Sequence, residues 1–196
     1  LRLDLTDDNF VEKLPRKKID VVFHLAAQSS GEISFDDPKY DLKTNTLGTL
    51  MLLNWCREND IKRFCYTSSM SIYGDQPHIP INENALASPK SFYGIGKLAS
   101  ELYMSMYESE GIFSTAYRLF NVYGPGQNMS NLRQGMVSIF LEQLHKKKNL
   151  LVKGCLERFR DFIYIDDVIN CFMQTLDDPV TYGKSYNVGT GIKTTV

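Results

Sequence analysis

The feature that most constrains the fold is a repeated alternation of short apolar runs with longer amphipathic segments. Residues 19–25, 63–67 and 114–119 are rich in apolar, β-branched and aromatic side chains, which suits strands buried on both faces of a parallel sheet. Residues 38–59 and 91–111, which lie between these runs, carry apolar side chains at helical spacing. Strands that alternate with helices in this way predict an α/β fold built on a doubly wound parallel sheet.

The C-terminal part of the chain continues this alternation. The elements expected there are a helix over residues 135–147, strands over 150–153 and 159–164, a helix over 166–176 and a strand over 185–188. Residues 1–5 read like the end of a strand, and residues 194–196 follow a strand and a glycine turn. We therefore expect a fragment that is cut at both ends.

Composition narrows the classes of function. The 196 residues are 43% hydrophobic and 23% charged, as in an ordinary globular domain with its own core. A net charge of −1 gives no general attraction to nucleic acid or to a membrane surface, and no apolar run reaches the length of a membrane span. The four cysteines form no C-x-x-C pair and no metal-ligand spacing, so we expect reduced thiols in a cytoplasmic protein without a metal. His24 has no metal-binding partner nearby in the sequence and is expected to be a satisfied core histidine.

The stretch from Ser91 to Ser100 reads S-F-Y-G-I-G-K-L-A-S and places Tyr93 and Lys97 four residues apart. On a helix this spacing stacks the two side chains on one face. A free tyrosine titrates near ~10, too high for a base at neutral pH, whereas an adjacent ammonium lowers that pKa. The pair is a candidate for moving a proton on and off a substrate hydroxyl. A chain of this composition contains about one such pair by chance, so an exposed pair without function stays an alternative at this point.

Small or polar residues follow three of the expected strands, namely Ala26-Ala27, Ser68-Ser69 and Phe120-Asn121. The carboxyl ends of parallel strands lie on one edge of the sheet, where open α/β sheets bind their ligands. The helix that carries Tyr93 starts from the same edge, so Ser69 can reach the same substrate oxygen as Tyr93. A Ser/Tyr/Lys arrangement is far more specific than the Tyr/Lys pair alone.

With these motifs in place, the sequence resembles the extended short-chain dehydrogenase/reductases, and among them the NAD-dependent nucleotide-sugar epimerase/dehydratase group. The resemblance covers nearly the whole chain. Its motifs, in order, are Asp4-Leu5, H-L-A-A from His24, N-T-L-G-T from Asn45, T-S-S-M-S-I-Y-G from Thr67, Y-G-I-G-K from Tyr93, R-L-F-N-V-Y-G-P from Arg118, R-D-F-I-Y-I-D-D-V from Arg160 and Y-N-V-G-T-G from Tyr186. It implies a Rossmann-like sheet, with residues 1–125 as a partial dinucleotide-binding domain that includes the catalytic helix. Residues 126–196 would be a substrate-side segment with the last strands of the sheet and an incomplete lobe.

The resemblance implies NAD as the cofactor and assigns contacts to it. Asp4 and Leu5 would lie against the adenine, and Leu25, Ala26 and Ala27 would line the pyrophosphate and ribose side, with Asn45 behind them. Ser68 would face the nicotinamide, and Phe120 would contact its amide region. Lys97 would hold the nicotinamide ribose and lower the pKa of Tyr93.

The substrate implied by the resemblance is a nucleotide-diphosphate sugar, most simply a UDP-hexose. Tyr93 would be the base and Ser69 would share the substrate hydroxyl. Asn121 and Arg160 would bind the diphosphate, which suits the arginine fork, and Asn131 and Leu132 would contact the nucleotide. Tyr93 would take the proton of the C4 hydroxyl while a hydride passes from C4 to NAD. The transient 4-keto sugar would turn over in the site, and the hydride and the proton would then return to it.

The residues at Ser69-Met70-Ser71 bear on which reaction of the family applies. Sugar 4,6-dehydratases resemble T-D-E or T-S-E here, and their carboxylate serves as acid and base in water elimination. Met70 and Ser71 therefore favour a 4-epimerase. The alternatives are a dehydratase, decarboxylase or carbonyl reductase of the same family, and a non-catalytic dinucleotide-binding module.

The family's G-x-x-G-x-x-G loop, which holds the pyrophosphate at a helix N-terminus, does not occur among the 13 glycines of this chain. The N-terminal glycine-rich unit and most of the C-terminal substrate lobe are expected to be missing. The fragment alone should therefore bind NAD poorly and be inactive, although its full-length parent is an enzyme. The resemblance also implies a homodimer in which the helices over 38–59 and 91–111 form a four-helix bundle, with Leu98, Leu102 and Met106 at the interface.

Overall fold

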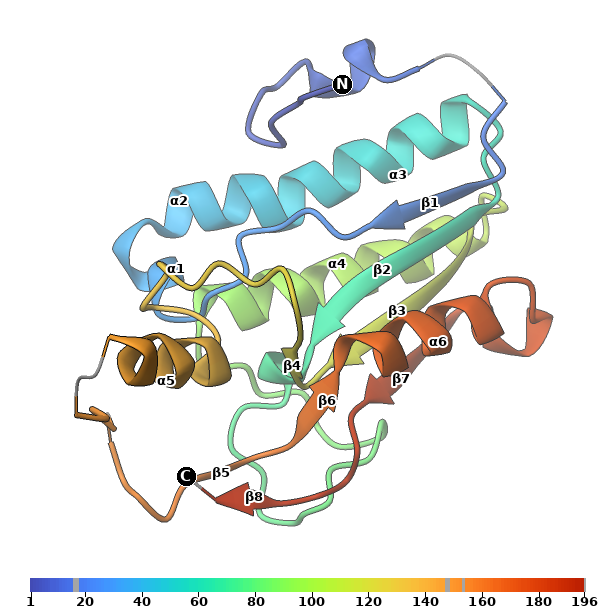
Figure 1. The fold of residues 1–196 in the computed structure, drawn as a ribbon. Coiled ribbons are helices and arrows are strands. Elements are labelled where there is room, and N and C mark those ends of the chain that lie inside the picture. Colours follow the sequence, from blue (N-terminus) through green and yellow to red (C-terminus); the bar gives the residue numbers. More distant parts are fainter. Residues whose placement is uncertain (16–17, 147–148, 153, 196) are drawn as a thin grey trace.

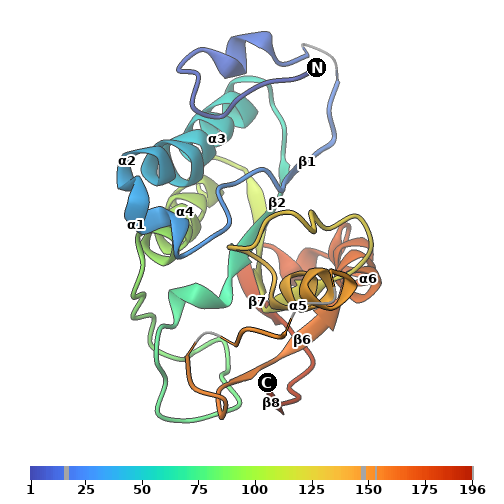
Figure 2. The ribbon, with the colours of Figure 1, turned by 60° about the vertical axis from the view of Figure 1, so that its left-hand side comes forward.

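The computed structural model describes residues 1–15, 18–146, 149–152 and 154–195. Its main sheet has the strand order β1-β2-β3-β7, and every neighbouring pair is parallel. These strands are β1 (Val21–His24), β2 (Arg63–Ser69), β3 (Phe113–Leu119) and β7 (Lys184–Val188). The predicted doubly wound parallel sheet is confirmed, with helices on both of its faces (Figures 1 and 2).

One face of the sheet is covered by α3 (Gly48–Glu58) and α4 (Phe92–Glu108), and the other by α6 (Ile165–Thr175). Strand β2 is buried almost throughout, because successive side chains enter different layers. Phe64 and Tyr66 join the core under α3 and α4, which also holds Leu53 and Met104. Cys65 joins the second core with Tyr117, Val168 and Phe172 under α6. The sheet is therefore the middle of three layers.

The expected helix over residues 38–59 exists but is not uniform. It begins with α2 (Pro38–Asp41), continues as a π-helical segment, η2 (Leu42–Leu47), and runs on into α3. Asp37 caps its N-terminus by accepting a hydrogen bond from the backbone of Tyr40, and Pro38 occupies the first turn, where its missing N–H costs nothing. The extra residue of the π turn is not visible in the spacing of apolar side chains, which is why the sequence predicts one ordinary helix.

Helix α4 begins where a serine can cap it. The Ser91 hydroxyl accepts a hydrogen bond of 3.0 Å from the backbone of Gly94. The first turn of α4 then packs on η3 (Met70–Ile72), the short helix that follows β2. A Cβ atom on Gly94 would stand 2.6 Å from the carbonyl oxygen of Ser71, so this close approach needs glycine. Sequence and packing thus fix Tyr93 beside the end of β2.

The C-terminal part differs from its prediction in two places. Residues 150–152 form no strand, and position 153 lies outside the described residues, so the strand expected there is wrong where it can be judged. Leu150 and Leu151 are instead exposed, and the backbone N–H of Leu151 donates a hydrogen bond of 2.7 Å to the side-chain oxygen of Gln143. The strand expected over 159–164 divides at Asp161, whose carboxylate accepts hydrogen bonds from the backbone of Thr190 and Gly191.

The two halves of that divided strand belong to separate small sheets. Strand β6 (Phe162–Tyr164) pairs in parallel with β4 (Asn121–Tyr123), and β5 (Phe159–Arg160) pairs antiparallel with β8 (Thr194–Thr195). Helix α5 (Met136–His145) lies near this region (Figure 1). The remaining short elements are η1 (Phe10–Lys13), α1 (Ile33–Asp36) and η4 (Pro179–Thr181). Residues 1–5, which resemble a strand end in sequence, form no strand.

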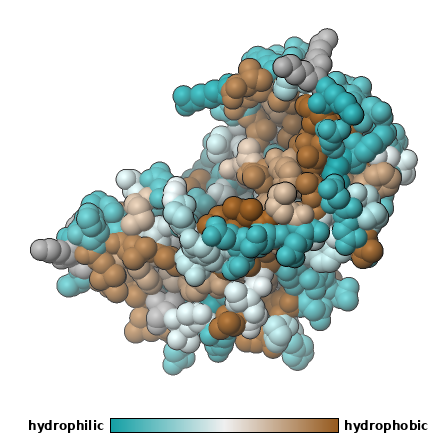
Figure 3. Space-filling model, turned by 45° about the vertical axis from the view of Figure 1, so that its right-hand side comes forward, coloured by the Kyte–Doolittle hydropathy of each residue, from teal (hydrophilic) through white to brown (hydrophobic). Residues whose placement is uncertain are grey.

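The N-terminal segment lies over α3, and Leu5 packs against the core beneath it. Figure 3 shows a hollow below this segment, with hydrophobic residues at its floor. At the β1 edge of the sheet, Phe23 and Leu25 are 37% and 54% exposed. Among the described residues, no helix combines the length and the apolar character needed to cross a bilayer.

Candidate active site

A cleft of about 600 Å³ opens at the carboxyl ends of the parallel strands. Its walls come from six parts of the chain: the loop after β1, the end of β2, the first turns of α4, the segment after β3, the start of α5, and β6 with α6. The predicted site residues that line it are Leu25, Ala27, Ser68, Ser69, Tyr93, Lys97, Phe120 and Asn121. The structure therefore brings together the three strand ends that the sequence singled out.

Tyr93 and Ser69 meet in this cleft. Tyr93 is 8% exposed and lines the cleft together with Ser69, whose hydroxyl accepts a hydrogen bond of 3.1 Å from the backbone N–H of Ser71. Burial raises the pKa of Tyr93, the nearby Ser69 side chain opposes the rise, and the charge of Asp41 adds to it. The net direction is upward and Lys97 is not among the groups that set it, so the expectation that Lys97 lowers this pKa is wrong for the structure as it stands.

Lys97 is buried beside this pair. Its Nζ donates a hydrogen bond of 2.7 Å to the carbonyl oxygen of Thr67 and lies 4.6 Å from the ring centre of Tyr66 and 5.7 Å from that of Tyr93. Burial lowers the pKa of Lys97 to about 7, while the charges of Asp41 and Glu101 act to raise it. The group is thus an amine that can change its charge near neutral pH, within the cleft and one helical turn from Tyr93.

The loop after β1 is fixed by the polar side chain of the π turn. Asn45 is 1% exposed; its Oδ1 accepts from the backbone N–H of Gln28 at 3.1 Å, and its Nδ2 donates to the Gln28 carbonyl at 2.9 Å. Asp41 accepts a further hydrogen bond from the same amide and another from the Gln28 side chain. The carbonyl oxygen of Asn45 accepts hydrogen bonds from the hydroxyls of Thr49 and Ser100, so the π turn is bonded to α3 and α4 as well as to the loop after β1.

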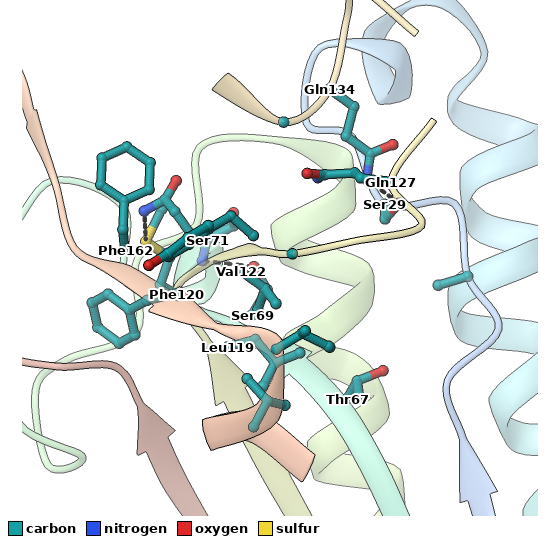
Figure 4. A pocket seen from close by; sticks show the side chains of 18 of the residues that line it. Ser29, Thr67, Ser69, Ser71, Leu119, Phe120, Val122, Gln127, Gln134 and Phe162 are labelled. Carbon is teal, nitrogen blue, oxygen red and sulfur yellow. Dashed lines mark hydrogen bonds between the residues drawn. The ribbon is translucent and has the colours of Figure 1, made fainter. Parts of the chain in front are cut away.

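The far wall of the cleft is formed by the segment after β3. Asn121 donates 2.9 Å to the carbonyl of Asp161, and its amide also contacts the sulfur of Met70 at 3.8 Å. Figure 4 shows Ser69, Ser71, Phe120 and Val122 around this part of the cleft. Across the mouth, Gln134 donates 2.6 Å to the hydroxyl of Ser29, which ties the segment before α5 to the loop after β1 (Figure 4).

Several predicted cofactor residues lie away from the cleft or use their side chains elsewhere. Asp4 bonds to Thr6, and Leu5 packs close to Gly48 at the start of α3; neither lines the cleft. Ala26 is exposed outside it, and Asn45 lies behind the loop, as the resemblance implied. Ser68 borders the cleft, but its hydroxyl is committed to the carboxylate of Glu101.

Three predicted substrate residues are likewise not brought to the cleft. Asn131 bonds to Gln134 and to the backbone of Arg133, and Leu132 is 51% exposed. Arg160 lies on β5 and donates to the carbonyl of Phe159; burial lowers its pKa, and the charge of Arg158 adds to that effect. Only Ser69 and Asn121 of the predicted substrate set line the cleft.

Sequence reasoning missed other polar groups of the site. Gln28 follows Ala26-Ala27 directly, and Gln127 ends the segment that leaves β3, so their places at strand ends could have indicated them. Asp41 could have been suspected from its position one helical turn before Asn45. Gln134 carries no signal in the sequence, because only the folded chain brings it to Ser29.

A buried ion pair supports the site from behind. Arg118 on β3 and Glu101 on α4 are 12% and 7% exposed and share a bond of 2.7 Å, with two further hydrogen bonds between them. Arg118 also donates to the hydroxyl of Tyr73, and Glu101 accepts from Ser68. This network joins α4 to the strands, so the helix that carries Tyr93 and Lys97 cannot slide along the sheet without breaking it.

His24 is the satisfied core histidine that the sequence suggested. It is 4% exposed, its Nε2 pairs with the Thr49 hydroxyl at 2.9 Å, and burial lowers its pKa to about 3, with the charge of Lys97 adding to the effect. No group of three or more His, Cys, Asp or Glu side chains that could hold a metal ion occurs within the described ranges.

A doubly wound parallel sheet whose edge presents a serine, a tyrosine and a lysine to one cleft defines the class of short-chain dehydrogenase/reductases. The comparison with family models agrees: the NAD dependent epimerase/dehydratase family matches residues 1–189. The chain belongs to this family, and the resemblance seen in the sequence is confirmed.

Relatives and solved structures support the same assignment. The chain is 35% identical over 196 residues to a UDP-glucose 4-epimerase of Mycolicibacterium smegmatis. This match covers 99% of this chain and 62% of the relative. It is 29% identical over 195 residues to human dTDP-D-glucose 4,6-dehydratase, covering 98% of this chain and 54% of the relative. The crystal structure of UDP-glucose 4-epimerase with UDP-glucose from Thermotoga maritima superposes with a TM-score of 0.90 at 33% identity, over 98% of this chain and 62% of that one. The chain thus spans less than two thirds of the length of these relatives.

Proposed function

We propose that the protein to which this chain belongs is an NAD-dependent nucleotide-sugar 4-epimerase that acts on UDP-hexoses. The observation that carries the proposal is the meeting of the Tyr93 phenol, the Ser69 hydroxyl and the Lys97 ammonium in one cleft at the edge of the sheet. A phenol that shares a cleft with an alcohol and a buried cation can take a proton from a substrate hydroxyl and give it back.

The residues present suit a dinucleotide. The ammonium of Lys97 makes one hydrogen bond within the described part of the chain, to Thr67, so two of its three N–H donors remain for ligand oxygens such as those of a ribose. Leu25 and Ala27 give that wall of the cleft a small, apolar surface. When bound, NAD accepts a hydride from the sugar and returns it. Phe120, Ser68 and Ala26, and further away Asp4, Leu5 and Asn45, remain proposed members of its surroundings.

In the proposed reaction, Tyr93 removes the proton of the sugar C4 hydroxyl and Ser69 donates a hydrogen bond to the same oxygen. Lys97 is proposed to hold the ribose of the cofactor through its free N–H donors, while burial keeps the pKa of Tyr93 raised. After the 4-keto sugar has turned, Tyr93 returns the proton to the oxygen of the epimeric alcohol. Asn121 is proposed to orient the diphosphate, and Arg160, Asn131 and Leu132 to contact the nucleotide end.

The choice of a 4-epimerase over a dehydratase rests on the lining of the cleft. Among the described residues that line it there is no Asp or Glu, and the Met70 side chain contacts Asn121 where an acid would be needed. Water elimination requires a group that protonates the leaving hydroxyl. The serines and amides of this cleft supply no such acid.

The deciding experiment assays the complete protein with NAD on a panel of UDP- and GDP-hexoses. The expected product is the C4 isomer of a UDP-hexose, formed without net consumption of the cofactor. A 4-keto-6-deoxy sugar would identify a dehydratase, and net use of reduced cofactor would identify a reductase. Tyr93→Phe should lower kcat by about 10²–10⁴-fold, as expected for the loss of a proton-transfer group, while Tyr40→Phe on the exposed part of α2 should leave it unchanged.

We further infer a homodimer through the outer faces of α3 and α4. Leu102 and Met106 on α4 are 61% and 69% exposed, which favours a covered surface in the assembled protein. Leu98, one turn earlier, is partly exposed on the same helix. Sedimentation of the complete protein with Leu102→Glu should show monomers, whereas the same substitution at exposed Leu86, in a loop, should leave dimers intact.

A further inference from the structure

Behind the Tyr93–Lys97 pair lies a carboxylate to which the proposed reaction gives no role. Asp41, the last residue of α2, is 1% exposed. Its Oδ1 accepts hydrogen bonds from the Gln28 side chain at 2.7 Å and from Asn45 at 2.9 Å. Its Oδ2 lies 3.6 Å from the point where a Cβ on Gly96 would stand, so this oxygen faces α4 next to Lys97. Hydrogen bonds from neutral amides alone do not replace the solvation that a carboxylate loses on burial, which indicates a stabilising positive charge nearby.

Lys97 is the cation whose charge acts on Asp41: burial raises the pKa of Asp41, and the hydrogen bonds from Gln28 and Asn45 and the charge of Lys97 oppose that rise. The other titratable groups around Lys97 are Tyr93 and Glu101 on α4, Tyr66 on β2 and His24 on β1. His24 is neutral above acid pH, since burial lowers its pKa to about 3. The charge of Glu101 is matched by its bidentate ion pair with Arg118. Asp41 is therefore the carboxylate near Lys97 that has no other cation bonded to it within the described residues.

We propose that Asp41 is a positioning residue of the Tyr93–Lys97 pair: its buried carboxylate favours the ammonium form of Lys97, and its hydrogen bonds fix the loop that follows β1. The inference rests on the proposed function, in which Lys97 acts as a cation. The effect on Lys97 and the positioning of the loop are linked through the π turn, because Asp41 and Asn45 both bond to Gln28 and to each other. The Asp41 carboxylate thus acts both on the charge of Lys97 in α4 and on the position of the loop after β1.

The charge effect has a definite sign. A negative charge near two titrating groups raises the pKa of both, and Asp41 acts in this direction on Lys97 and on Tyr93. Asp41→Asn keeps an oxygen that can accept from Gln28 and Asn45 but removes the charge. The pKa values of Lys97 and Tyr93 should then both fall, so the pH–kcat profile should move to lower pH.

The test compares Asp41→Asn with Thr46→Val in the complete protein. Thr46 lies on the same π turn and its hydroxyl faces the same Gly96, 3.5 Å from its carbonyl, but it carries no charge. We expect Asp41→Asn to move the limbs of the pH–kcat profile to lower pH by about one pH unit and Thr46→Val to leave them in place. A lower kcat without any displacement of the limbs would show a merely structural role and overturn the proposal.

A second readout separates this inference from the proposed function. The ¹³Cε resonance of Lys97, assigned by its loss in Lys97→Met, can be titrated in the protein without cofactor or substrate. Its midpoint should fall in Asp41→Asn, even if the protein proves to have a different activity. An unchanged midpoint would reject the inference and leave the epimerase proposal standing. Should Asp41→Asn not fold, the ¹³Cγ resonance of Asp41 in the unaltered protein decides: it should show an inflection at the midpoint of Lys97, and its absence overturns the proposal.

Discussion

Lys97 on α4 is bonded to the carbonyl oxygen of Thr67 on β2, at 2.7 Å, in a position where only 2% of the residue is exposed. This bond joins the second turn of α4 to the carboxyl end of a central strand. Burial at this position removes the ammonium from water, so that the pKa of Lys97 falls to about 7.

The stability of the protein should rise with pH above neutrality because of Lys97. Its pKa is lowered from 10.5 to about 7 in the folded state, so between these values the unfolded chain binds more protons than the folded one. The slope contributed is at most about 1.4 kcal/mol per pH unit. Urea unfolding at about pH 7.5 and about pH 9 should show this rise, and Lys97→Met should remove it. Lys90→Met, at an exposed lysine, should retain the rise; equal slopes in all three proteins would contradict the assignment.

His24 should make the fold sensitive to acid. Its pKa is lowered from 6.5 to about 3, so the folded state loses stability as the pH falls below 6.5 and the unfolded chain takes up the proton. His24→Gln should flatten the decline between about pH 6.5 and about pH 4, by up to about 1.4 kcal/mol per pH unit. His78→Gln, at an exposed histidine, is the matched control and should decline like the unaltered protein. Chemical unfolding followed by circular dichroism measures both.

The ion pair of Arg118 and Glu101 should be costly to break from one side. Arg118→Met leaves the Glu101 carboxylate buried without its cation, and we expect a loss of about 3–5 kcal/mol in the free energy of unfolding. The double substitution Arg118→Met with Glu101→Leu removes both charges and should cost less than the single one. If the double variant is less stable than Arg118→Met alone, the Arg118–Glu101 pair stabilises the fold by more than the compensation of a buried charge.

Gly94→Ala tests the contact between α4 and the turn after β2. The new methyl group would stand 2.6 Å from the carbonyl of Ser71 and 3.0 Å from the Cβ of Pro89, and backbone atoms cannot yield as a side chain can. We expect a loss of about 1–3 kcal/mol in stability, as for overpacking elsewhere. The start of α4 should also move away from Ser69, so kcat should fall more than stability implies. Ile95→Ala, at the exposed neighbouring position, should change neither quantity appreciably.

Residues 1–196 taken alone should bind NAD weakly. Their cleft offers a lysine and small apolar walls, but none of the 13 glycines forms the G-x-x-G-x-x-G loop that would bind a pyrophosphate through backbone N–H groups. Titration calorimetry of this chain and of the complete protein under the same conditions provides the comparison. A strong signal from residues 1–196 would show that the residues of this cleft suffice.

The sequence predicted the layers and the centre of the site well because these follow from local patterns. Apolar runs such as residues 63–67 can satisfy their backbone only in a sheet, and the serine that caps α4 stands directly before Tyr93. The joint placement of Ser69, Tyr93 and Lys97 followed from the rule that parallel strands end on one edge.

What the sequence did not reveal depends on contacts between distant segments. The strand expected at residues 150–153 has no pairing partner where it is described, and strand formation requires one. The direction of the Tyr93 pKa follows from burial, which spacing along a helix does not report. The placement of Arg160 on a small antiparallel pair depends on β8, from a part of the chain more than thirty residues later.

The π turn at Leu42–Leu47 has a consequence for how related sequences are aligned. An α-helix turns by about 100° per residue, so deleting one residue here would rotate Asp41 and Pro38 about the helix axis relative to α3. Asp41 would then point away from Gly96, while Asn45 could stay beside Gln28. A relative with one residue fewer in this segment would therefore not place a carboxylate beside Gly96, even if the rest of its helix matched this one.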